Sequence, residues 1–143
     1  MSNYRHLAEI ERVVQEFGDG TLPCAQWTHA AHLTVGLWYL RDSPPHEALD
    51  RVREAIKRYN AHCGRVDSPT GGYHETLTRF YLWLIGRYLN GLPDCSDWLA
   101  VTNGLLAHDD AGRDAALRYY TRERLMSAEA RSGWVPPDLL ALA

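Results

Sequence analysis

Two histidines, His29 and His32, lie three residues apart in the segment WTHAAHL at residues 27–33. In a helix, residues at this spacing share one face, with Cβ atoms ~5–6 Å apart. Helical bundles use such a pair of side chains to bind one ion. Only alanines separate the two histidines on this stretch, so no bulky side chain keeps the rings apart. The spacing favours a shared ligand site on a helix.

A second polar cluster, GGYHETLT at residues 71–78, stands where another helix is expected to begin. If the two helix starts meet, His74 supplies a third imidazole. Three histidines with an open fourth position form the kind of catalytic site that holds zinc, and nickel, manganese, iron or copper also fit. Such a divalent metal ion activates water or polarises a carbonyl. We therefore predict that His29, His32 and His74 are metal ligands.

Glu75 follows His74 directly and is the predicted general acid or base beside this centre. Alternatively, Glu75 has a purely structural role and forms an ordinary i, i+4 ion pair with Arg79 on the helix surface. Polar and aromatic side chains near the histidines are the predicted substrate-binding groups: Trp27, Thr28, Tyr73 and Thr78, with Trp38 further along. The pattern predicts a small metal-dependent enzyme, a hydrolase or lyase, that hydrolyses, eliminates from or isomerises a small polar or anionic metabolite.

Two other functions fit the same residues. A helix N-terminus carries partial positive charge, which disfavours a cation and favours an anion. A metal-free protein would grip a carboxylate or phosphate with the histidines and with the hydroxyls of Thr28 and Thr76. The third alternative is a structural or regulatory protein that dimerises through some of its five tryptophans and eight tyrosines.

Apolar residues at helical spacing predict that the chain is all-α. The predicted helices cover residues 3–17, 29–40, a stretch beginning near 45, 73–90, 97–107, 114–120 and 127–131. Thr28 and Ser43 are the expected N-caps of the second and third helices. The second and fourth are apolar on most sides, as central helices are. We predict a compact single-domain bundle of about five to six helices over residues 1–143.

The net charge of −3 argues against a nucleic-acid partner, and no apolar run approaches the ~20 residues of a membrane span. The polar N-terminus predicts no signal peptide. Three scattered cysteines, Cys24, Cys63 and Cys95, make a disulfide framework unexpected and favour a reducing cytoplasm. The expected partner is a small-molecule substrate, and a homodimer is compatible with the aromatic content.

Four motifs resemble an uncharacterised family of small bacterial helical proteins. They are WTHAAHL at 27–33, YHETLT at 73–78, YTRERL at 120–125 and VPPDL at 135–139. The resemblance covers most of the chain from Trp27 onward. It implies that the two histidine clusters belong to one recurrent design, and it carries no activity with it.

Overall fold

The structure is a computed structural model that describes residues 4–143, and within this range it contains helices and no strand. The all-α prediction is confirmed. The long helices are α1 Leu7–Asp19, α2 His29–Asp42, α3 Pro45–His62, α4 Glu75–Asn90 and α5 Trp98–Ala107. Two short helices, α6 Arg122–Leu125 and α7 Ala128–Ser132, follow near the C-terminus. Short 3₁₀ turns form at Cys24–Gln26, Asp109–Ala111 and Ala115–Arg118.

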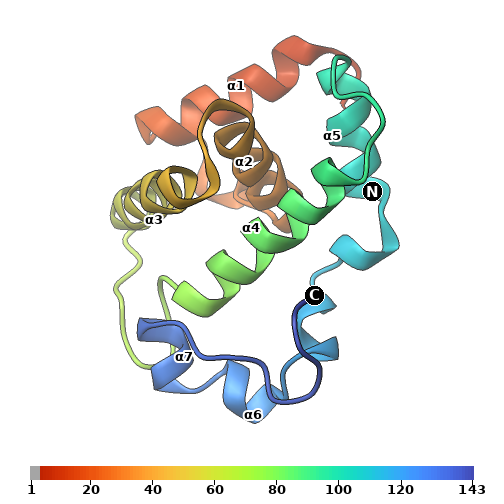
Figure 1. The fold of residues 1–143 in the computed structure, drawn as a ribbon. Helices are drawn as coiled ribbons and strands as arrows, with labels where there is room; N and C mark the ends of the chain where they lie inside the picture. The colour runs from red at the N-terminus through yellow and green to blue at the C-terminus, as the bar shows by residue number, and fades with distance from the viewer. Residues whose placement is uncertain (1–3) are drawn as a thin grey trace.

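Helices α2 and α4 form the centre of the fold, as their apolar composition predicts. Helix α2 contacts α1, α3, α4 and α5, while α4 also contacts α7. Figure 1 shows α4 running diagonally from the short C-terminal helices to the α5 end of the molecule. Gly36 lets the two central helices approach closely, because a Cβ atom there would lie 2.9 Å from Ile85 Cδ1.

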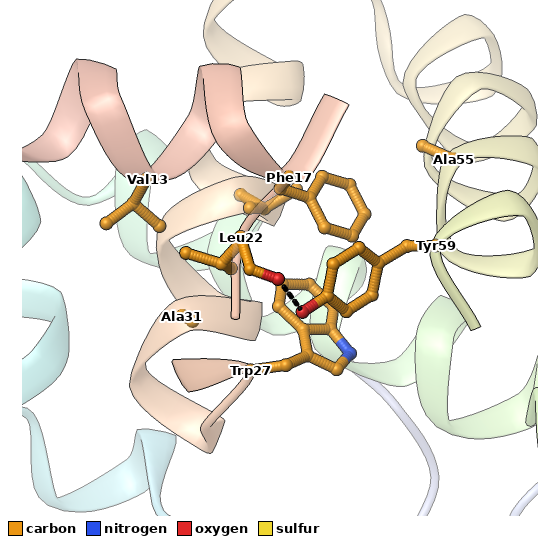
Figure 2. Packing of buried hydrophobic residues seen from close by; sticks show 8 residues of the cluster. Val13, Phe17, Leu22, Trp27, Ala31, Ala55 and Tyr59 are labelled. Atoms are coloured by element: carbon orange, nitrogen blue, oxygen red, sulfur yellow. Dashed lines mark hydrogen bonds between the residues drawn. The ribbon is translucent and has the colours of Figure 1, made fainter. Parts of the chain in front are cut away.

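An aromatic cluster fixes the start of α2. The Trp27 ring stacks on Phe17 with ring centroids 4.4 Å apart, and Tyr59 of α3 lies 5.3 Å from Trp27 (Figure 2). The Tyr59 hydroxyl donates a 2.7 Å hydrogen bond to the Leu22 carbonyl. Helices α1 and α3 therefore hold the loop before α2, and with it Trp27, in one position.

A disulfide joins Cys24 and Cys63, which corrects the expectation that the cysteines stay unlinked. Cys24 lies in the loop that precedes α2, and Cys63 ends α3. The two residues are 39 positions apart in sequence, and the packing of α1, α2 and α3 brings them together. Cys95 is the free cysteine of the described chain.

The local predictions hold for some caps and fail for others. Thr28 caps α2, since its Oγ1 accepts the Ala31 N–H. Ser43 does not cap α3. Pro44 occupies that position, and the Ser43 hydroxyl accepts a hydrogen bond from Arg51 instead. The predicted helix at 114–120 is a 3₁₀ turn, and α6 was not predicted.

No helix within residues 4–143 has the length and apolar character needed to cross a bilayer.

Candidate functional site

A cavity of about 660 Å³ lies where α2, α3 and α4 meet the loop at 63–74. His29, His32 and His74 all line it, so the two histidine clusters do lie together. The four predicted substrate-binding side chains line it as well: Trp27, Thr28, Tyr73 and Thr78. Its apolar lining comes from α2, α3 and α4 and includes Leu33, Val52, Ile56, Leu77, Leu82 and Ile85.

Among the described residues that line this cavity, histidines aside, the charged ones are all arginines. Arg65, Arg113 and Arg131 line it, whereas no Asp or Glu of the described chain does. No carboxylate within residues 4–143 forms an ion pair with these three arginines. Arg131 donates from Nη1 to the Gly72 carbonyl at 3.1 Å, and its buried Nε has no hydrogen-bond partner within residues 4–143. The cavity is therefore lined by positive charge that no carboxylate of the described chain neutralises.

Backbone carbonyls fix the proton positions of His29 and His32. A carbonyl only accepts hydrogen bonds, so the His32 nitrogen 2.7 Å from the Thr28 carbonyl, Nδ1, carries a proton. The remaining nitrogen, Nε2, then presents a lone pair. In His29 the roles are reversed: Nε2–H donates to the Ala111 carbonyl at 2.8 Å, and Nδ1 keeps the lone pair. Each ring thus has one free acceptor nitrogen.

His32 is held in its neutral form. Its ring is open to the cavity but lies among protein atoms, against Trp27 with ring centroids 3.8 Å apart. This desolvation lowers the pKa of His32 to about 4, and the charges of Arg65 and Arg113, together with that of His29 when it is protonated, act in the same direction. The Thr28 carbonyl opposes the shift only in part. His32 therefore offers an uncharged acceptor at neutral pH.

His74 has no free ring nitrogen. Its Nδ1 accepts the Leu77 N–H at 3.1 Å and so caps α4, while Nε2–H donates to the Leu125 carbonyl at 2.7 Å. Burial lowers the pKa of His74, and the Arg131 charge adds to this effect. The ring therefore links the start of α4 to α6 in its neutral form.

Within residues 4–143, no three His, Cys, Asp or Glu side chains are grouped so that they could hold a metal ion. His29 and His32 each keep a free nitrogen, but His74 would have to release a backbone partner before it could bind a metal. Coordination by these three histidines therefore stays a prediction.

Glu75 is fully engaged in an ion pair. Its two oxygens accept hydrogen bonds from Nε and Nη2 of Arg53 at 2.8 and 2.6 Å, and Oε1 also accepts the Tyr73 hydroxyl at 2.7 Å. These bonds, those from Arg53 above all, lower the pKa of Glu75. Its ion-pair partner is Arg53 rather than Arg79, and Glu75 does not line the cavity. Its acid–base role stays a prediction, and in this arrangement it orients the Tyr73 ring.

Two side chains that were predicted to contact the ligand do not line the cavity. Trp38 packs against Trp98 and under Arg41 and does not line the cavity. Thr76 is fully buried, donates to the Gly133 carbonyl and accepts the Val135 N–H. The three arginines were missed, because they lie far apart in sequence in a loop, a turn and a short helix. No local spacing links them.

Acid should destabilise the protein through its histidines. The folded-state pKa values of His32 and His74 lie below the ordinary 6.5, so the unfolded chain takes up protons that the folded chain does not. The free energy of unfolding should fall as the pH drops from about 6.5 towards 4. Because His32 is open to the cavity, we expect it to contribute well below the roughly 1.4 kcal/mol per pH unit of a fully shifted group.

Urea unfolding of the wild type and of His32→Phe, measured between pH 7 and pH 4.5, tests this prediction. The variant should lose less stability on acidification than the wild type. Equal losses in the two proteins would show that His32 protonation does not oppose folding.

Comparisons of the chain with protein-family models, with curated proteins and with solved structures find no match.

Proposed function

We propose that this protein binds a small organic anion in the cavity between α2, α3 and α4. The observation that carries the proposal is the charge of the lining: Arg65, Arg113 and Arg131 stand on it, with no acidic side chain of the described chain to neutralise them. Guanidinium groups form strong, often bidentate hydrogen bonds with carboxylates and phosphates. An anion in the cavity would pair with guanidinium groups that form no ion pair in the described chain.

The ends of two long helices support the same charge preference. Helix α2 begins at His29 and α4 begins at Glu75, and the capping residues of both, Thr28 and His74, line the cavity. A helix N-terminus favours negative charge by ~0.3–1 kcal/mol at an exposed site. This contribution is small, and the arginines supply the larger share.

The apolar part of the lining supports an organic ligand over an inorganic ion. Leu33, Leu82 and Ile85 come from the central helices, and Trp27 and Tyr73 add aromatic walls. At about 660 Å³ the cavity has the size of small-molecule sites, which combine apolar walls with a few polar groups. A ligand with an apolar body and one acidic group matches both parts of the lining.

Calorimetric titration with phenylacetate, and with neutral phenylacetamide as its isostere, tests the proposal. The acid should bind and the amide should bind at least about tenfold more weakly, because a charged partner is worth ~1.5–3 kcal/mol. Arg131→Gln should weaken phenylacetate binding about fivefold or more by the same reasoning. Arg12→Gln on the exposed face of α1 is the matched control and should bind like the wild type. Equal binding of acid and amide, or an unchanged Arg131→Gln, would contradict the proposal.

The metal-dependent enzyme is the second candidate. It is favoured by one observation: His29 and His32 line the same cavity and each keeps a free ring nitrogen. Elemental analysis of protein purified without a histidine tag should then find close to one Zn, Ni, Mn, Fe or Cu ion per chain. Metal far below that level, with no uptake when each ion is added, would remove this candidate.

A further inference from the structure

The cavity contains a fixed hydrogen-bond acceptor that an anion alone would not use. His32 donates from Nδ1 to the Thr28 carbonyl, and its face packs on Trp27. A flip of the ring would break the Thr28 hydrogen bond, so Nε2 stays the free nitrogen. His29, one turn earlier on the same helix, is fixed in the same manner by the Ala111 carbonyl and keeps Nδ1 free. An acid bound only through arginines would leave both lone pairs without a donor.

The donor that complements His32 is a neutral one. An ammonium group would meet Arg65 and Arg113, whose charges already act on His32, and would find no carboxylate on the described lining. A hydroxyl group donates a hydrogen bond without adding positive charge. A hydroxyl group also suits a lining that is partly apolar and partly polar. Its removal from water costs little free energy where one acceptor is positioned to receive its hydrogen bond.

We infer that the ligand is a hydroxylated organic acid, with its acidic group among the cavity arginines and its hydroxyl donating to His32 Nε2. This inference rests on the proposed anion-binding function and adds the second polar group of the ligand. A site built to accept a hydrogen bond discriminates against an analogue that lacks the donor, because the acceptor is then left unpaired. His32 is open to the cavity, so water partly replaces the missing donor, and we expect discrimination of about tenfold.

Calorimetric titration of the wild type with the 2-, 3- and 4-hydroxyphenylacetates, phenylacetate and the three methoxy counterparts tests the inference. At least one hydroxy isomer should bind about tenfold tighter than phenylacetate. Its methoxy counterpart, which fills similar space but has no donor, should lose the gain. In His32→Phe, which keeps an aromatic ring beside Trp27, the hydroxy isomer should bind no tighter than phenylacetate. His46→Phe at the exposed start of α3 is the matched control and should keep the full gain.

The outcomes separate this inference from the proposed function. If phenylacetate binds through the arginines and no hydroxy isomer improves on it, the inference fails and the anion-binding function stands. A gain that persists in His32→Phe, or that the methoxy compounds share, also overturns it. If none of the acids binds, both fail. Phenylacetate binding by His32→Phe itself reports whether that variant keeps its fold.

Discussion

Replacement of Cys24 by Ser should lower the free energy of unfolding by about 4 kcal/mol. The Cys24–Cys63 disulfide closes a loop spanning 39 positions, and a cross-link of this span removes a large part of the conformational freedom of the unfolded chain. Urea unfolding under non-reducing conditions measures the loss. Wild-type protein treated with excess dithiothreitol should unfold at nearly the same urea concentration as Cys24→Ser.

Cys95→Ser is the matched control for this prediction. Cys95 is free and partly exposed, so its replacement should change stability by no more than about 0.5 kcal/mol. Thiol titration of the unfolded chain should find one free cysteine before reduction and three after it. Three free thiols before reduction, or a reduced protein as stable as the oxidised one, would contradict the disulfide.

Removal of the Arg53 side chain should cost about 3 kcal/mol of stability. Glu75 is 7% exposed, and Arg53 provides two of the three side-chain hydrogen bonds to its carboxylate. In Arg53→Ala this charge stays buried with only the Tyr73 hydroxyl as a partner, and an uncompensated buried charge is expensive. Thermal or urea unfolding at pH 7 measures the loss.

Asp50→Ala is the matched control, because Asp50 contacts the same arginine from the surface. Its side chain is 72% exposed, so the loss should stay below about 1 kcal/mol. Replacement of both members of the buried pair, in Arg53→Met with Glu75→Leu, should be less destabilising than Arg53→Ala alone. Similar losses in Arg53→Ala and Asp50→Ala would show that Glu75 does not depend on this guanidinium.

The helices and their central pair could be predicted from the sequence. The spacing of apolar residues indicates which helix faces are buried, and a capping residue marks where a helix begins. Thr28 caps α2 as expected, and α2 and α4 form the centre. The sequence places the two histidine clusters at the starts of these two helices, and in the structure both clusters line one cavity. These features depend on local pattern and on the topology of a small bundle.

The partners of the polar side chains could not be predicted in this way. Glu75 pairs with Arg53 across two helices, and His74 uses both ring nitrogens on backbone groups, one of them 51 residues away. The disulfide joins two of three cysteines that no spacing rule connects. The cavity arginines come from three separate segments. Each of these contacts is decided by tertiary packing, which a one-dimensional pattern does not encode.

The central claim is that an organic anion binds in the cavity between α2, α3 and α4. Titration of ¹⁵N-labelled protein with phenylacetate, followed by two-dimensional NMR, tests it most directly. The claim predicts saturable shifts concentrated at the cavity, with the side-chain signals of Trp27 and Arg131 among those that move. Shifts centred on the second cavity around Trp83 and Arg118, or no saturable shift at all, would contradict it.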